Sequence, residues 1–265
     1  MRYLRKFMKL SDYVINFLRD EYGVDTIFTL CGAGCMHLLD SLGTAEGVNF
    51  VANHHEQASA IAAEGYARIN NKLGACIVTS GPGGTNALTG TLCSWLDSIP
   101  VIVVSGQVNK SMSTNFTGLN LRQLGDQEFN IVETVQNMTK YAVQVNNPED
   151  IRFHLEKACY LATNGRPGPV WLDIPLDVQT AKIEPENLES FTPPTKPFIS
   201  QNIIEEVVKK INSAKRPLFV LGNGIRLSGG VEELHKLLQK TNIPIITAVN
   251  GNDLVNENYR AYYGR

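Results

Sequence analysis

Residues 74–86 join an apolar strand to a glycine-rich turn, and this combination constrains the fold more than any other stretch of the chain. Residues 74–79 read Gly-Ala-Cys-Ile-Val-Thr, a continuous apolar run typical of strands that are buried on both faces. The turn Ser-Gly-Pro-Gly-Gly-Thr-Asn occupies 80–86, and a helix predicted over 86–97 leads to a second apolar run at 100–105. Strand, turn, helix and strand in this order predict a parallel α/β sheet.

The same succession of strands and helices continues on both sides of this unit. Apolar and amphipathic patterns predict further helices over 9–22, 36–42 and 148–162, and further strands over 26–30, 48–52 and 170–174. A proline-containing stretch without apolar periodicity predicts a linker over 181–198. We therefore predict an open, mostly parallel sheet with helices on both faces in residues 1–180, and the beginning of a second, incomplete α/β domain in 199–265.

The composition disfavours several classes of protein. The chain has 24 Lys and Arg against 26 Asp and Glu, a formal net charge of −2, which leaves no basic surplus for a nucleic-acid partner. No apolar run approaches the length of a membrane span, and no signal-peptide block follows the basic N-terminus. The five cysteines are odd in number and predict reduced thiols in a cytoplasmic protein.

A metal site is the alternative interpretation of one cysteine-containing segment. Cys31 and Cys35 lie close to His37 in the sequence. A four-coordinate site needs further ligands at matched spacing, and no second Cys/His pair is present. We therefore predict no metal-binding residues in this chain.

Residues 53–68 predict a helix whose start carries the first candidate functional carboxylate. Asn53 is a suitable cap, and Glu56, three residues later, can reach back to the amide of the cap. Taken alone, these residues favour the structural role. However, ligands of parallel sheets bind beyond the carboxyl ends of the strands, so Gly32, Glu56 and the turn at 81–86 are predicted to share one crevice.

The glycine-rich turn carries little specificity by itself. Amides at a helix N-terminus bind anions, so the turn at 81–84 is a candidate phosphate cradle, although a tight strand-to-helix turn is the default. It lacks the Gly-Lys-Ser/Thr of a Walker loop and the spacing of a dinucleotide fingerprint. An NAD-binding domain is therefore the weakest alternative.

A set of short motifs occurs in a fixed order along the chain. They are His-Glu-Gln at 55–57, Ala-Glu-Gly-Tyr-Ala-Arg at 63–68, the turn at 79–86, Asp-Ser-Ile-Pro at 97–100, Ser-Gly-Gln-Val at 105–108, Gly-Arg-Pro-Gly-Pro-Val at 165–170 and Asp-Ile-Pro at 173–175. In order and spacing they resemble the acetolactate synthase-like (acetohydroxyacid synthase) family of thiamine diphosphate enzymes. Residues 8–180 resemble its pyrimidine-binding domain, and residues 198–265 resemble the beginning of its central domain.

The resemblance implies specific site residues. Glu56 would hydrogen-bond the pyrimidine nitrogen para to the exocyclic amine, and Gln127 would face the substrate from the long segment 106–128. Gly32 would let the backbone approach the reacting centre. The implied catalytic residues are Glu56, Gln127 and Gly32, and the implied cofactor-binding residues are Glu56, Pro82, Asn86, Gly32 and Ala33.

The resemblance also implies the reaction and the partners. A 2-oxo acid would be decarboxylated or joined to an acceptor with thiamine diphosphate, in a homodimer or homotetramer. Mg²⁺ would be held with the diphosphate by a carboxyl-terminal domain with a Gly-Asp-Gly…Asn motif, which residues 1–265 lack. FAD is a further cofactor of this family. The alternative is a non-catalytic interaction or regulatory subunit that keeps the fold, and retention of Glu56 argues against it.

The departures from the family pattern lie on the substrate side. Thr29-Leu30-Cys31-Gly32-Ala33 replaces the usual Gly-Tyr-Pro-Gly-Gly, and the segment between Val108 and Gln127 is longer than usual. Asp126 stands where relatives commonly have Phe, and Leu176 replaces a common Lys. The cofactor chemistry is therefore better supported than acetolactate as the product.

Overall fold

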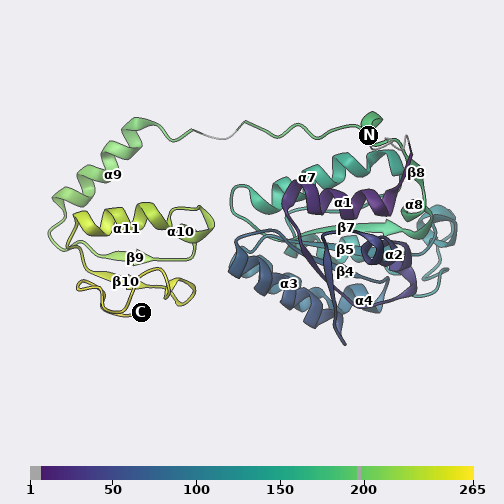
Figure 1. Ribbon diagram of the computed structural model, residues 1–265, viewed down its shortest axis with the longest axis horizontal. Coiled ribbons are helices and arrows are strands. Elements are labelled where there is room, and N and C mark those ends of the chain that lie inside the picture. The colour runs from purple at the N-terminus through teal and green to yellow at the C-terminus, as the bar shows by residue number, and fades with distance from the viewer. Residues whose placement is uncertain (1–6, 196–197) are drawn as a thin grey trace. The chain divides into compact units, whose positions relative to one another are not determined.

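The computed structural model of the chain describes residues 7–195 and 198–265 (Figure 1). It contains two compact units, which meet in the sequence between Pro193 and Pro194. All of the candidate site residues lie in the first unit.

A parallel sheet of six strands forms the centre of the first unit. From one edge to the other, its strands are β3 (Asn49–Ala52), β2 (Thr26–Thr29), β4 (Gly74–Val78), β5 (Val101–Gln107), β7 (Val170–Pro175) and β6 (Ala142–Gln144). Every neighbouring pair is parallel. The predicted α/β class with an open parallel sheet is confirmed.

Helices cover both faces of this sheet (Figure 1). They are α1 (Leu10–Tyr22), α2 (Met36–Thr44), α3 (Glu56–Asn70), α4 (Pro82–Asn86), α5 (Leu88–Asp97), α6 (Ile131–Val135), α7 (Ile151–Thr163) and α8 (Leu176–Gln179). Short 3-10 turns lie at Ala33–Cys35, Lys110–Met112, Thr114–Phe116, Gln136–Met138, Pro148–Asp150 and Pro185–Asn187. Helices α1, α2 and α7 share one core, whereas α3 and α5 pack together on the other face.

Successive side chains of the central strands β4 and β5 point to opposite faces of the sheet, and both faces are buried. Ala75 and Ile77 of β4 join Ile102 and Val104 of β5 in the core beneath α1 and α7. Cys76 is also fully buried but lies outside that core, because successive side chains of a strand point to opposite faces. Burial on both faces explains why the strand reads as a continuous apolar run.

The glycine-rich turn differs from the expectation of a loop followed by one helix. Pro82 begins α4, a single short helix within the turn, and α5 follows it from Leu88. Proline suits the first helical position, where its missing N–H costs no intrahelical hydrogen bond. Gly83 and Gly84 of the turn therefore lie within a short helix, and Gly81 precedes it.

Part of the segment predicted as a linker packs against the first unit. Strand β8 (Lys182–Ile183) pairs antiparallel with β1 (Met8–Lys9). Leu188 is buried in the core that α1 and α7 share. Residues 182–188 are therefore held by ordinary sheet pairing and apolar burial.

The second unit is a smaller α/β arrangement. Its elements are α9 (Gln201–Ser213), β9 (Phe219–Leu221), α10 (Gly224–Leu227), α11 (Val231–Lys240), β10 (Ile245–Thr247) and a 3-10 turn at Val249–Gly251. Strands β9 and β10 are parallel, and Leu234, Leu238 and Ile245 contribute to its core. None of the helices in the described residues has the length and apolar character needed to cross a bilayer.

Candidate functional site

The candidate residues gather at the carboxyl ends of the central strands. Thr29 at the end of β2 is in register with Ala52 of β3 and with Ile77 of β4. The three connections that follow these strands therefore leave the sheet at the same edge. They lead to the segment of Gly32, to the start of α3 and to the glycine-rich turn.

Glu56 is the first residue of α3, and its side chain faces the glycine-rich turn. It is 7% exposed, and Asn86 donates from Nδ2 to Glu56 Oε2 at 2.9 Å. No hydrogen bond within the described residues reaches Oε1 of Glu56. One carboxylate oxygen is thus held in place, and the other is left to meet a ligand.

The predicted cap of this helix is wrong. His55 is the N-cap, and its Nδ1 accepts a hydrogen bond from the backbone N–H of Gln57 at 3.1 Å. The Asn53 side chain instead donates to Ser59 Oγ at 3.0 Å. Glu56 occupies the first helical position and completes no capping box. The capping role that the sequence favoured for Glu56 is therefore wrong, although Glu56 is still an acidic residue in the first turn of the helix.

Gly83 allows the glycine-rich turn to approach Glu56. A Cβ added at Gly83 would lie 3.1 Å from Glu56 Oε1 and 2.6 Å from Thr79 Cγ2. Any side chain at this position would displace one of these neighbours. Pro82, next to it, is exposed at the start of α4. Glu56, Pro82, Gly83 and Asn86 therefore line one surface.

Gln127 reaches the same turn from the long segment after β5. Its backbone has φ 57°, and a Cβ added at Gly81 would lie 2.3 Å from the Gln127 carbonyl oxygen. Gly81 has φ 54°, in the left-handed region that favours glycine. The structure thus places Gln127 against the turn that also faces Glu56.

Gly32 and Ala33 pack beside the turn through Thr79. A Cβ added at Gly32 would lie 2.4 Å from the Thr79 Cβ, and the Gly34 amide donates to Thr79 Oγ1 at 2.9 Å. This crowding requires glycine at position 32 whether or not a ligand is bound. Ala33 is exposed at the start of its 3-10 turn. Close approach of Gly32 to a reacting centre stays a prediction.

The two cysteines of this segment differ in their surroundings, since Cys31 is exposed and Cys35 is buried. Cys35 is buried, and its Sγ lies 3.4 Å from the Gly32 carbonyl oxygen. Burial raises the pKa of the Cys35 thiol to about 11, which makes this thiol a poor nucleophile at neutral pH. Among residues 7–195 and 198–265, no three His, Cys, Asp or Glu side chains are grouped as metal ligands.

Sequence reasoning missed a buried polar cluster at the ends of β5 and β7. Asp173, 1% exposed, accepts from Ser105 Oγ at 2.6 Å, from Gln107 Nε2 at 3.1 Å and from Gln144 Nε2 at 3.0 Å. Trp171 donates from Nε1 to Ser105 Oγ at 2.8 Å. The motifs at 105–108 and 173–175 contain Ser105, Gln107 and Asp173. The sequence therefore identified these residues as part of the family pattern, but it did not predict that they contact one another.

Replacing Asp173 by asparagine is expected to flatten the pH dependence of stability. Burial raises the pKa of Asp173 from 3.8 to about 6, against hydrogen bonds from Ser105, Gln107 and Gln144 that lower it. The raised pKa makes a contribution to folding that is fully present below pH 3.8 and is lost as the pH rises through about 6.

Urea unfolding at a series of pH values measures this effect. Between about pH 4 and 6, wild-type stability should fall more steeply than that of Asp173→Asn, by up to about 1.4 kcal/mol per pH unit. Identical slopes for the two proteins would contradict the assignment of a raised pKa to Asp173.

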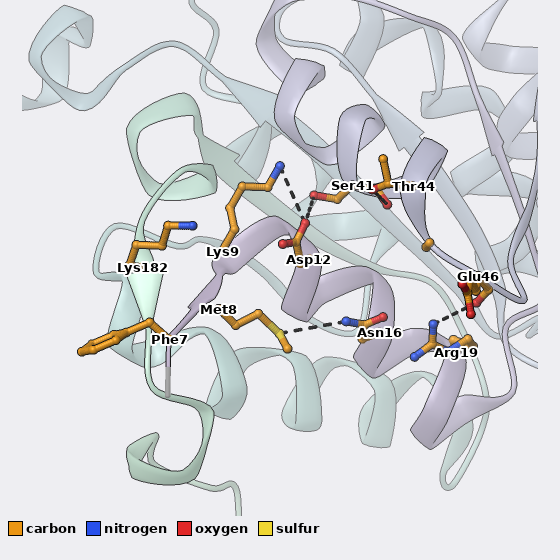
Figure 2. Close-up of a pocket in the computed structure, with 11 residues that line it drawn as sticks. Phe7, Met8, Lys9, Asp12, Asn16, Arg19, Ser41, Thr44, Glu46 and Lys182 are labelled. Carbon is orange, nitrogen blue, oxygen red and sulfur yellow. Dashed lines mark hydrogen bonds and ion pairs between the residues drawn. The ribbon is translucent and has the colours of Figure 1, made fainter. Parts of the chain in front are cut away.

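A separate pocket of about 480 Å³ lies along α1, away from these residues (Figure 2). Two of its three basic side chains form ion pairs: Lys9 Nζ lies 2.7 Å from Asp40 and 3.7 Å from Asp12, and Arg19 Nε lies 2.6 Å from Asp20. None of the candidate site residues lines this pocket. The geometry favours the surface between α3 and the glycine-rich turn.

Two family models match the chain. The model of the thiamine pyrophosphate enzyme N-terminal TPP-binding domain matches residues 8–134, and that of the central domain of the same enzymes matches residues 204–265. The first match contains Glu56, the glycine-rich turn and Gln127.

Similar proteins cover almost the whole chain. An acetolactate synthase large subunit of Lactococcus lactis is 34% identical over 244 residues, 91% of this chain and 41% of that protein. One of Buchnera aphidicola is 37% identical over 248 residues, 91% of this chain and 42% of that protein. The chloroplastic acetolactate synthase of Arabidopsis thaliana is 34% identical over 249 residues, 92% of this chain and 35% of that protein. The chain thus spans about two fifths of the length of the bacterial relatives.

Proposed function

Since the chain belongs to the acetolactate synthase-like family of thiamine pyrophosphate enzymes, we propose that it forms the pyrimidine-binding half of an active site that decarboxylates or ligates a 2-oxo acid. The observation that carries the proposal is the buried Glu56 carboxylate, which has one oxygen fixed by Asn86 and the other directed to the glycine-rich turn.

The residues present fit a planar heteroaromatic ring. Glycine at position 83 places no side chain of the turn against Glu56 Oε1. A carboxyl group at this position can exchange a proton with a ring nitrogen, and Asn86 keeps it from rotating away. Pro82 offers an apolar surface at the same turn, and Ala33 lies exposed in the segment next to Thr79.

When bound, thiamine diphosphate supplies an acidic thiazolium carbon and an electron sink for decarboxylation. In our proposal, Glu56 Oε1 holds a proton shared with the pyrimidine nitrogen, and the burial of Glu56 excludes water from that hydrogen bond. Gln127, with its carbonyl oxygen against Gly81, presents its amide to the substrate. Gly32 keeps the backbone near the reacting atoms accessible.

Further implications of the family resemblance extend the proposal. We infer that Mg²⁺ and the diphosphate are held by residues outside 1–265, that the protein assembles as a homodimer or homotetramer, and that it acts in the cytoplasm. FAD binding, the transferase or lyase class, and the identity of the 2-oxo acid stay predictions.

Turnover of 2-oxo acids by the full-length protein tests the proposal. We expect release of CO₂ that depends on thiamine diphosphate and Mg²⁺, and product analysis would separate simple decarboxylation from ligation to an acceptor. Binding of the cofactor without turnover of any 2-oxo acid would support the non-catalytic subunit instead.

Residues 1–265 alone are expected to bind thiamine diphosphate weakly. The proposed site contributes ring contacts but no group for the diphosphate, whose charge usually supplies much of the affinity of such ligands. Calorimetric titration with the cofactor, with and without Mg²⁺, measures this, and thiamine without the diphosphate is the matched ligand. Tight, Mg²⁺-dependent binding would contradict a divided site.

A further inference from the structure

The Glu128 carboxylate accepts hydrogen bonds from two separate parts of the long segment that carries Gln127, residues 113–114 and 124–125. Its Oε1 accepts from Ser113 Oγ at 3.0 Å, from the Thr114 amide at 2.6 Å and from Thr114 Oγ1 at 2.8 Å. Its Oε2 accepts from the amides of Leu124 at 2.9 Å and Gly125 at 3.2 Å. One carboxylate therefore closes residues 113–128 into a compact loop.

The two ends of this loop are also tightly packed against each other near Gly125. A Cβ added at Gly125 would lie 2.7 Å from the Met112 carbonyl oxygen and 2.9 Å from Val108 Cγ1. The two ends of the loop can approach so closely only because position 125 is glycine. The hydrogen bonds of Glu128 and this packing contact therefore hold the beginning and the end of the loop together.

A further hydrogen bond restrains the chain at Phe129, the residue after Glu128. Gln107 donates from Nε2 to the Phe129 carbonyl oxygen at 2.9 Å, and the same nitrogen lies 3.1 Å from Asp173 Oδ2. Gln127 is thus followed directly by two restrained residues, Glu128, which binds the loop, and Phe129, which accepts from Gln107 at the end of β5. Beside these two restraints, the Gln127 backbone has φ 57°, a conformation that non-glycine residues seldom adopt.

We infer that Glu128 is a positioning residue that closes the 113–128 loop and thereby fixes the neighbouring Gln127 against Gly81. The part played by Gln127 towards a substrate rests on the proposed function, whereas closure of the loop does not. Partial burial alone raises the pKa of Glu128, but hydrogen bonds from the Leu124 and Thr114 amides, the Thr114 hydroxyl and the Gly125 amide lower it to about 2. The carboxylate that closes the loop is therefore ionised at neutral pH.

The substitution Glu128→Gln tests the inference in the full-length protein. Glutamine keeps the size but replaces one acceptor oxygen by an NH₂ group, which cannot accept from the amides on its side of the loop. We expect amide exchange of Thr114, Leu124 and Gly125 to become at least about tenfold faster, since these amides lose their hydrogen bonds to the carboxylate. Exchange in β4 and β5 should not change.

Kinetics separate positioning from simple loop stability. Glu128→Gln should raise KM for the 2-oxo acid by about tenfold or more and leave proton exchange of the bound cofactor, which depends on Glu56, unchanged. Glu128→Asp keeps the charge and should recover part of both effects. Glu133→Gln, an exposed glutamate on α6, is the matched control and should behave as wild type.

Three results would overturn the inference. Unchanged amide exchange in the loop would show that Glu128 does not close it. Fast exchange with an unchanged KM would show that the loop does not position Gln127. If the wild-type protein turned over no 2-oxo acid, the proposed function would fail, and unchanged exchange of the Thr114, Leu124 and Gly125 amides in Glu128→Gln would then refute loop closure by itself.

Discussion

Replacing Glu56 by glutamine is expected to slow exchange of the thiazolium proton of bound thiamine diphosphate by about 10²–10⁴-fold in the full-length protein. Glutamine can still accept a hydrogen bond from Asn86, so the side chain should keep its place. It has no acidic proton to share with the ring nitrogen. The fold should lose at most about 1 kcal/mol, because His55 and not Glu56 caps α3.

Quenched NMR of proton–deuterium exchange, together with a thermal melt, measures both effects of Glu56→Gln. Glu64→Gln is the matched control, because Glu64 lies on the same helix and is ion-paired with Arg68. It should lower the melting temperature and leave exchange of the cofactor proton intact. The opposite pattern, unchanged exchange and a lower melting temperature in Glu56→Gln, would make Glu56 a structural residue.

The sheet could be predicted because the informative pattern is local. Each central strand is buried on both faces, so a run such as residues 74–79 is apolar throughout and ends where the glycine turn begins. The rule that parallel sheets bind ligands at the carboxyl ends of their strands then placed Gly32, Glu56 and the turn at one edge. Gln127 was added by resemblance, since no local pattern relates it to Gly81.

The start of α3 was predicted wrongly because a local motif competed with a strand. Asn53 and Glu56 have the spacing of a capping box, but the Asn53 amide donates to the Thr29 carbonyl oxygen at 2.9 Å and so extends the pairing of β3 with β2. This bond occupies the amide from which Glu56 would accept in a capping box. His55, which is not among the preferred capping residues, then takes the cap position.

The polar contacts that organise the site were beyond prediction because their partners are distant in the sequence. Asp173 meets Ser105 across β5 and β7, and Glu128 meets the chain near Thr114 through a loop whose regular structure is a single 3-10 turn at Thr114–Phe116. Neither contact has a periodicity that would reveal it. Only the folded backbone brings such donors and acceptors together.

Replacing Gly81 by alanine is expected to destabilise the fold by about 2–3 kcal/mol and to impair substrate binding. The residue has φ 54° and ψ −115°, which strains any residue with a Cβ, and the added atom would lie 2.3 Å from the Gln127 carbonyl oxygen. Either the turn or Gln127 must move. We therefore expect a raised KM for the 2-oxo acid in addition to the loss of stability.

Denaturant unfolding and steady-state kinetics of the full-length protein measure the two effects of Gly81→Ala. Gly65→Ala is the matched control, because Gly65 lies within α3 and a Cβ added there would meet nothing within 4 Å. Alanine in that helix should raise stability by about 0.5–1 kcal/mol and leave KM unchanged. If Gly81→Ala were as stable as wild type and bound substrate equally well, the contact between Gly81 and Gln127 would have no part in shaping the site.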